Sequence, residues 1–188
     1  MTILKSLQVL LALSVVTLML AACERGVEKP AGRVILTASG NITETNRGPY
    51  DEKLDVLFKY HEISFEKAFE FDEGMLLLLN QERVRVETPE TGKPVTLQGP
   101  TLKSVLKMLG VEKPQMVRFL ALDGYATELD AKAIESKDWI VAVTIDGRPL
   151  EIGRLGPVWV VFRLDNPPHA DPNEELTWPW AVFYMEVK

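Results

Sequence analysis

The sequence predicts an α+β fold with a mixed, mostly antiparallel sheet and short helices. Runs of β-branched and aromatic residues, bounded by turn residues, outnumber the helical patterns along the chain. The two kinds of element are interspersed and do not fall into separate halves. In one segment, 138–152, Asp146 and Gly147 stand between two apolar runs, and this dipeptide is a strong short-range signal of an antiparallel β-hairpin.

The first 22 residues have the layout of a secretory signal. Lys5 is the only charged residue before Cys23, an apolar run extends from Ser6 to Ala22, and small residues stand at its end. We therefore expect 1–22 to be a signal peptide. The run almost reaches the length that spans a bilayer, so a retained membrane anchor is the second interpretation.

The residues Leu20–Cys23 resemble a bacterial lipobox, in which the Cys is acylated and becomes the first residue of the mature chain. Cys23 is the only cysteine, so no disulfide is expected. The sequence predicts lipidation of Cys23, with acyl chains such as palmitate, followed by a polar tether over 23–32. Each methylene buried in the membrane contributes about 0.8 kcal/mol. A signal peptide with an incidental Cys at its edge is the alternative.

The first part of the domain begins with a strand over 33–42 and a loop over 43–53 that is rich in Asn, Gly and Pro. The next stretch, 54–71, is ambiguous, because its aromatic residues fit both a helical face and the alternation of a strand. Asp72 is positioned to cap a short helix over 73–81.

A strand over 83–88 precedes the clearest helix, 99–111, which Gly110 can close. Four apolar residues of this helix recur at i, i+3, i+4 and i+7: Leu102, Val105, Leu106 and Leu109. Because the lysines lie on the opposite side, the apolar face must be buried.

The second half of the chain predicts further strands, joined by turns and one helix. In order, they are a strand over 116–122, a tight turn at 123–125, a strand edge and a helix capped by Asp130 within 126–137, the hairpin 138–152, a strand over 155–164, a long surface loop over 165–179 and a closing strand over 180–188. One domain, 33–188, accommodates all of these elements.

Composition excludes several classes of function. The net charge of −6 argues against a nucleic-acid partner, because phosphates need a basic surface. His61 and His169 have no Cys or His at ligand spacing, so no metal site is predicted. The sequence also contains no Gly-rich phosphate loop, nucleophile elbow or metalloprotease helix, and it predicts no catalytic residue.

Four motifs occur in order: "LQGPTLKSVLKMLG", "LALDGYATEL", "VTIDGRPLEI" and "LGPVWVVF". Together they resemble the small, stand-alone bacterial members of the oxidoreductase molybdopterin-binding family. The resemblance extends over 33–188 and implies the sulfite-oxidase-type molybdopterin-binding fold.

Two departures from the family put its chemistry in doubt. In catalytic members a cysteine thiolate binds molybdenum in the segment before the Gly-x-x-Leu helix, but the corresponding 84–99 has no Cys. Catalytic relatives also carry an Arg soon after the Gly-Pro of the later strand, where it meets the anionic cofactor. Trp159 and Val160 stand in that region, and the nearest cations are Arg154 and Arg163.

The resemblance implies a fold more firmly than a chemistry. We expect a lipid-anchored protein of the cell envelope, facing the periplasm or the exterior, whose degenerate domain is an accessory module without a cofactor. Its partners would be the membrane, reached through the lipid, and a small ligand or another envelope protein. The alternative is a molybdopterin-dependent oxidoreductase, or a subunit of one, that holds the cofactor without a cysteine.

Five residues are candidates for the ligand site. Asp123 and Tyr125 can present a carboxylate and a phenol at a pocket rim, and Arg154 supplies a cation. Trp159 and Trp178 can stack on a flat ligand. Each also has an ordinary structural interpretation, as a turn, an exposed charge or buried aromatic core.

Overall fold

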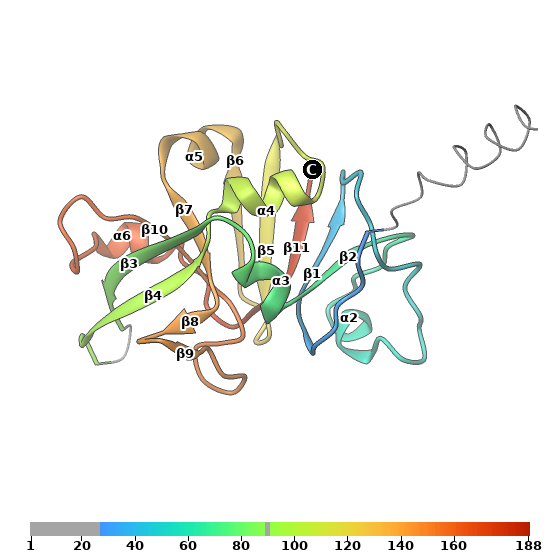
Figure 1. The fold of residues 1–188 in the computed structure, drawn as a ribbon, viewed down its shortest axis with the longest axis horizontal. Coiled ribbons are helices and arrows are strands. Elements are labelled where there is room, and N and C mark those ends of the chain that lie inside the picture. The colour runs from blue at the N-terminus through green and yellow to red at the C-terminus, as the bar shows by residue number, and fades with distance from the viewer. Residues whose placement is uncertain (1–26, 89–90) are drawn as a thin grey trace, which may run out of the picture.

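The computed structural model describes residues 27–88 and 91–188. The chain forms three β-sheets with short helices around them (Figure 1). The predicted signal peptide and Cys23 lie outside the described residues. Within those residues, no helix has both the length and the apolarity needed to cross a membrane.

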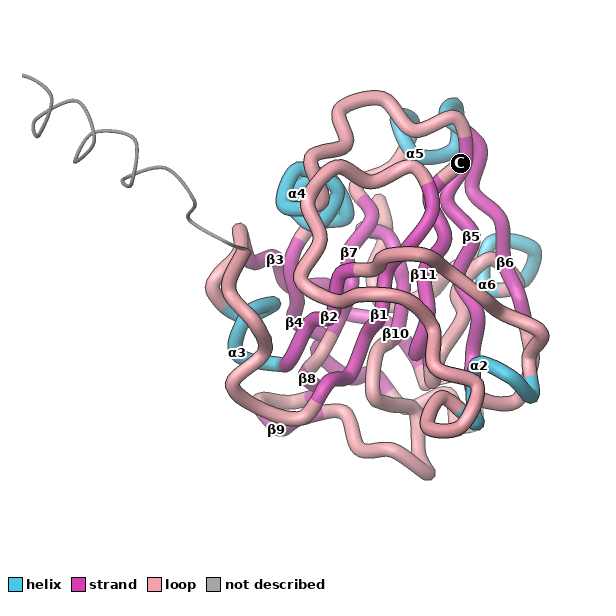
Figure 2. Tube along the Cα trace, turned by 90° about the vertical axis from the view of Figure 1, so that its right-hand side faces the viewer, coloured by secondary structure: helices cyan, strands magenta, loops and turns pink. Residues whose placement is uncertain are grey.

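The elements alternate irregularly along the chain, and in Figure 2 the short helices lie around the strands. Their bounds are β1 (Val34–Gly40), α2 (Val56–Tyr60), β2 (Phe69–Asp72), α3 (Glu73–Leu77), β3 (Gln81–Glu87), β4 (Pro94–Pro100), α4 (Leu102–Met108), β5 (Met116–Ala121), β6 (Ala126–Asp130), α5 (Ala131–Ser136), β7 (Trp139–Ala142), β8 (Thr144–Ile145), β9 (Arg148–Pro149), β10 (Trp159–Phe162), α6 (Pro172–Glu175) and β11 (Val182–Val187).

The sheets are mixed and mostly antiparallel, as predicted. The five-stranded sheet has the order β2-β1-β11-β5-β6, the four-stranded sheet β3-β4-β8-β9, and β10 pairs with β7. Only β1 and β11 are parallel among the strand pairs of the described residues, with Thr37 opposite Tyr184. The fold class expected from the sequence is therefore confirmed.

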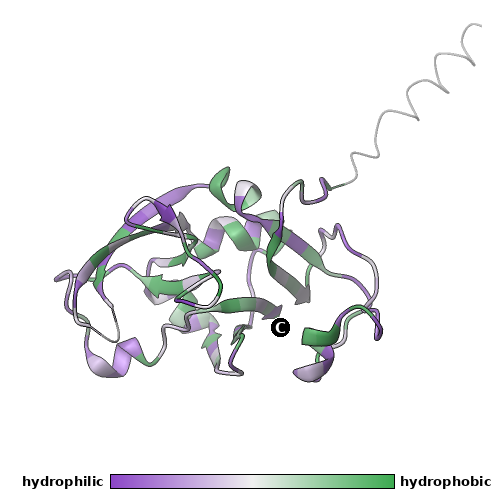
Figure 3. Cartoon of the chain, turned by 90° about the horizontal axis from the view of Figure 1, so that it is seen from below, coloured by the Kyte–Doolittle hydropathy of each residue, from purple (hydrophilic) through white to green (hydrophobic). Residues whose placement is uncertain are grey.

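One main hydrophobic core joins the three sheets, and Figure 3 shows hydrophobic residues along the central strands. The helix α4 buries Leu102, Val105 and Leu106 in this core. At its start Thr101 accepts a hydrogen bond from the Ser104 backbone N–H (3.2 Å), which satisfies an unpaired donor of the first turn. The predicted spacing of the apolar residues thus corresponds to the buried face of the helix.

A second, smaller core lies beside α2 and contains Phe58 and Phe183. The Arg47 guanidinium lies over the Phe58 ring, 5.5 Å from its centroid, and forms ion pairs with Asp55 and Glu70. These contacts attach the segment around α2 to the five-stranded sheet.

The predicted caps Asp72 and Asp130 begin the helices α3 and α5, but α3 ends at Leu77, four residues before the predicted end at 81. The ambiguous stretch 54–71 divides into the helix α2 and most of the strand β2. The strand β4 was not predicted, and its last residues, Gly99 and Pro100, were assigned to the following helix. Consequently α4 begins at Leu102, three residues later than the pattern indicated.

The predicted hairpin is confirmed only at its turn. Asp146 and Gly147 connect β8 and β9, but these paired arms have two residues each. The apolar run Trp139–Ala142 pairs instead with β10, because both strands are fully buried and need a partner inside the core. The loop predicted over 165–179 contains the short helix α6.

The described part of the predicted tether, 27–32, lies against the domain. Val27 packs on the main core, and the Glu28 carbonyl accepts a hydrogen bond from the Asn46 side chain (3.1 Å). The Gly32 backbone N–H donates to the Asp72 carboxylate (2.6 Å). These contacts attach the beginning of the domain to the β2–α3 junction.

Candidate functional site

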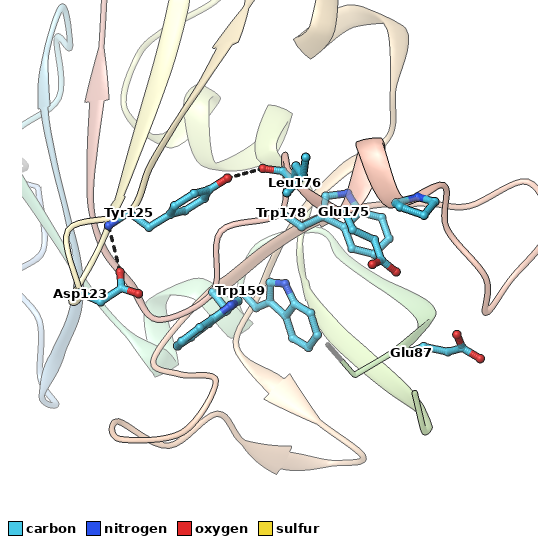
Figure 4. Close-up of a pocket in the computed structure, with 9 residues that line it drawn as sticks. Glu87, Asp123, Tyr125, Trp159, Glu175, Leu176 and Trp178 are labelled. Atoms are coloured by element: carbon cyan, nitrogen blue, oxygen red, sulfur yellow. Dashed lines mark hydrogen bonds between the residues drawn. The ribbon is translucent and has the colours of Figure 1, made fainter. Parts of the chain in front are cut away.

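A cavity of about 310 Å³ lies between the end of β3, the β5–β6 turn, β10 and the segment around α6 (Figure 4). We call it the aromatic pocket. It is lined by Glu87, Asp123, Tyr125, Trp159, Pro172, Glu175, Leu176, Trp178 and Trp180. Its volume is at the lower end of the range for small-molecule sites, roughly 300–1,000 Å³.

The buried side of the pocket is built on strand β10. Trp159 lies opposite Ala142 of β7 and is only 1% exposed. The next residue, Val160, donates its backbone N–H to the Pro179 carbonyl (2.9 Å), which holds the segment Trp178–Trp180 beside β10. Trp159 of β10 and the two tryptophans of the later segment, Trp178 and Trp180, therefore line one cavity.

Trp178 is also buried, with 5% of its surface exposed. Its ring contacts Phe162 edge to face, with 5.1 Å between ring centroids. The Nε1 atoms of Trp159 and Trp178 are both buried, and neither has a hydrogen-bond partner among the described residues. Because a buried N–H without an acceptor costs free energy, these two donors are an unusual feature of the pocket.

The β5–β6 turn forms another wall. Gly124 has φ of 90°, a value that suits glycine, as predicted for this tight turn. The Asp123 carboxylate accepts a hydrogen bond from the Tyr125 backbone N–H (2.9 Å). The Tyr125 hydroxyl donates to the Leu176 carbonyl (2.5 Å), so the phenol bridges the turn and the segment after α6 (Figure 4).

The helix α6 is held from both sides. At its start the Asp171 carboxylate accepts a hydrogen bond from the Asn173 backbone N–H (2.8 Å). At its end Glu174 forms an ion pair with Lys137, which follows α5, with 2.7 Å between the charged atoms. This anchoring places the neighbouring Glu175 at the pocket.

The charges that line the pocket are all negative. They belong to Glu87, Asp123 and Glu175, and the lining contains no Lys, Arg or Cys among the residues that the structure describes. One basic side chain, His169, contacts this lining: its Nδ1 lies 3.0 Å from a Glu87 carboxylate oxygen. The pocket therefore combines aromatic walls with a negative electrostatic potential.

The structure brings four of the five predicted ligand-binding residues together, namely Asp123, Tyr125, Trp159 and Trp178. Arg154 lies elsewhere: it lines another cavity near β8 and β9, its side chain is 79% exposed, and it pairs with Glu151. Sequence reasoning missed four of the residues that line the pocket: Glu87, Pro172, Glu175 and Leu176. The remaining lining residue is Trp180, two residues after the predicted Trp178.

The donor set of the pocket does not fit molybdopterin. The anionic cofactor is held by cationic groups, and molybdenum in the catalytic members of the family that the sequence resembles needs a soft thiolate. The lining supplies three carboxylates in their place. Over 27–88 and 91–188, no group of three or more His, Cys, Asp or Glu side chains could hold a metal ion.

The chain has the sulfite-oxidase-type molybdopterin-binding fold. It is similar to the crystal structure of the sulfane dehydrogenase SoxCD from Paracoccus pantotrophus, with a TM-score of 0.53 and 13% sequence identity. The alignment covers 86% of this chain and 40% of that one, so this chain spans less than half of the larger protein. No protein-family model and no curated protein sequence matches the chain. At this identity the similarity establishes the fold and leaves the activity open.

Proposed function

We propose that this protein is a lipid-anchored accessory module of the cell envelope that binds a small ligand or a partner protein in the aromatic pocket. In this proposal 1–22 is removed, Cys23 is acylated, and the lipid is the contact with the membrane. The domain faces the periplasm or the exterior. Tethering confines the domain to the membrane surface and raises its effective concentration toward ligands or partners there.

The proposal rests on one observation: the two segments that depart from the family both contribute residues to the aromatic pocket. The resemblance puts the molybdenum ligand in 84–99 and a cofactor-binding Arg after Gly156-Pro157. Glu87 of the first segment and Trp159 of the second line the same pocket. Where a catalytic relative would hold metal and anion, this chain presents a carboxylate and an indole, which favours recognition over molybdenum chemistry.

The pocket is suited to recognition by shape and by contact. Its buried tryptophans give a rigid apolar surface, and aromatic side chains lose little conformational freedom on binding. The rim carboxylates provide polar contacts that orient a ligand. The Tyr125–Leu176 hydrogen bond holds two walls at a fixed separation before the ligand arrives, so less ordering is needed on binding.

The decisive measurement is the cofactor content of the full-length protein purified from membranes. We expect neither molybdenum by inductively coupled plasma mass spectrometry nor pterin fluorescence at a stoichiometric level. Stoichiometric molybdenum or pterin would replace this proposal with a molybdopterin-dependent oxidoreductase, the alternative that the fold alone allows. A catalytic relative expressed in the same host shows that the cofactor was available.

The anchor is tested separately by mass spectrometry of the N-terminal peptide. We expect acyl chains on Cys23 and loss of membrane association in the variant Cys23→Ser. An unmodified Cys23 in the mature protein would remove the anchor from the proposal without affecting the pocket.

A further inference from the structure

We propose that the aromatic pocket selects a small organic cation, an ammonium ion carried on a flat or branched apolar group. This inference rests on the proposed ligand-binding function and names the class of ligand. It follows from three features of the pocket: the sign of its charges, its aromatic faces and its lack of a metal-binding geometry.

Charge comes first. Glu87 at the end of β3, Asp123 in the β5–β6 turn and Glu175 in α6 belong to three separate segments, yet all line one cavity. Like charges around one cavity repel each other. A cation between them relieves this repulsion. An anionic ligand would add to it, because the described lining offers no Lys or Arg to compensate.

The aromatic faces favour a cation of the organic kind. Trp159, Trp178 and Trp180 line the pocket, and indole is the best side chain for cation–π contact. Elsewhere in the described chain, Arg47 and Lys137 already lie over phenylalanine rings. None of the cation–π contacts of the described residues involves a tryptophan. Trp159 and Trp178 are almost fully buried, so Trp180, with 38% of its surface exposed, is the indole of the lining that a cation from outside can reach most directly.

A bare metal ion fits the pocket poorly. Calcium needs six to eight oxygen ligands at about 2.3–2.6 Å, and the three carboxylates do not form such a group. Apolar side chains, among them Leu176 and Pro172, line the pocket together with the charged ones. An ammonium ion on an apolar body suits this mixed lining, since its charge is spread over methyl or methylene groups that prefer aromatic contact.

The two unpartnered indole N–H groups are an independent indication that the pocket is incomplete without a ligand. Trp159 and Trp178 bury these donors without an acceptor among the described residues. A cation that also carries a hydroxyl or carbonyl oxygen can satisfy one of them after a small movement of the ring, because the rings line the cavity. We therefore expect an oxygen acceptor to strengthen binding.

The test is a titration of the full-length protein with three probes of similar shape. The probes are benzyltrimethylammonium, its uncharged isostere neopentylbenzene, in which carbon replaces nitrogen, and the anion phenylmethanesulfonate. Tryptophan fluorescence and isothermal titration calorimetry measure the binding of each probe. The cation should bind about tenfold more tightly than the isostere, from cation–π and carboxylate contacts together. Its affinity should fall with added salt, and the anion should bind most weakly.

Variants that neutralise one carboxylate each test whether the preference for the cation arises in this pocket. Asp123→Asn keeps an oxygen that can accept from the Tyr125 N–H but removes one negative charge from the pocket, and Glu175→Gln removes another. Each should weaken benzyltrimethylammonium about threefold to tenfold and leave neopentylbenzene unchanged. The matched control is Glu151→Gln, which removes the same charge from an exposed pair with Arg154 outside this pocket. This control should bind the cation as the wild type does.

The outcomes separate the inference from the proposed function. Equal affinity for the cation and its isostere, or no binding of the cation, would overturn the cation inference and leave the accessory-module proposal to the cofactor analysis. Preference for the sulfonate would overturn it as well. A lysine-containing peptide that binds more tightly than benzyltrimethylammonium would reassign the pocket from a small ligand to a side chain of a partner protein. Stoichiometric molybdenum would instead refute the proposed function itself.

Discussion

Trp139 and Trp178 provide a matched pair for testing the unsatisfied indole of the aromatic pocket. Both contact Phe162 edge to face, with centroid distances of 5.0 and 5.1 Å, and their exposed fractions are 4% and 5%. Their indole N–H groups differ in hydrogen bonding. The Trp139 Nε1 donates to the Ala133 carbonyl (2.8 Å), whereas the Trp178 Nε1 has no partner among the described residues.

Replacing either residue by Phe removes the same volume from a similar environment, so the cavity contribution cancels when the two variants are compared. Trp139→Phe also loses a hydrogen bond, worth about 1 kcal/mol net. Trp178→Phe loses none and removes a buried donor whose desolvation costs about 1–3 kcal/mol. The free energy of unfolding should therefore be lower for Trp139→Phe than for Trp178→Phe by about 2 kcal/mol or more.

Urea denaturation of the ligand-free protein, followed by far-UV circular dichroism, measures both free energies of unfolding. Circular dichroism is preferred because each substitution removes a fluorophore. If Trp178→Phe is destabilised as much as Trp139→Phe, the Trp178 Nε1 is satisfied in solution, for example by a bound water. The evidence that the pocket lacks a hydrogen-bonding partner would then be lost, although its charges would still favour a cation.

Three further predictions concern Asp72, Tyr125 and Gly99. Burial alone would raise the pKa of Asp72, but the backbone N–H groups of Met75 and Gly32 donate to its carboxylate and hold the pKa below the ordinary value. Its contribution to stability is therefore present above the unfolded-state pKa and is lost as the pH falls through the folded-state pKa. Urea denaturation at a series of acidic pH values should show the free energy of unfolding fall as the pH falls, and this fall should be smaller in Asp72→Asn. Tyr125→Phe should change the free energy of unfolding by less than about 1.5 kcal/mol yet weaken benzyltrimethylammonium by calorimetry, because the bridge to α6 is lost; unchanged affinity would show that the bridge does not position the pocket. Gly99→Ala should lower the free energy of unfolding by about 1–3 kcal/mol in the same urea assay, because its methyl group would collide with a backbone carbonyl of β7, and wild-type stability would refute this close approach.

Local chemistry explains what the sequence predicted correctly. The helix α4 follows from four apolar residues at helical spacing, and α3 and α5 follow from Asp72 and Asp130, whose carboxylates accept from backbone N–H groups in the first turn. The β8–β9 turn follows from Asp146-Gly147, with φ values of 48° and 75°. Each of these signals is contained within at most about two helical turns of chain.

Long-range pairing explains what was missed. The partner of β7 is β10, and no local pattern near Trp139 distinguishes that strand from the other arm of a hairpin. Glu87 stands at the end of an ordinary alternating strand, and only the approach of α6 turns it into a pocket residue. Trp178 was identified because a large aromatic residue in a loop is conspicuous, and Trp159, on a predicted strand, because an indole can stack on a flat ligand. Their neighbours Glu175 and Leu176 have no such signature.

The backbone around the aromatic pocket is held by contacts between protein residues. Trp159 is held by the pairing of β10 with β7, and the segment of Trp178 is held by the Val160–Pro179 hydrogen bond. These contacts belong to the core and persist whatever fills the cavity. A change of the side chains that line the cavity can therefore change the ligand without changing the architecture. The three carboxylates that line the cavity, with no Lys or Arg among the described lining residues, favour a cation there.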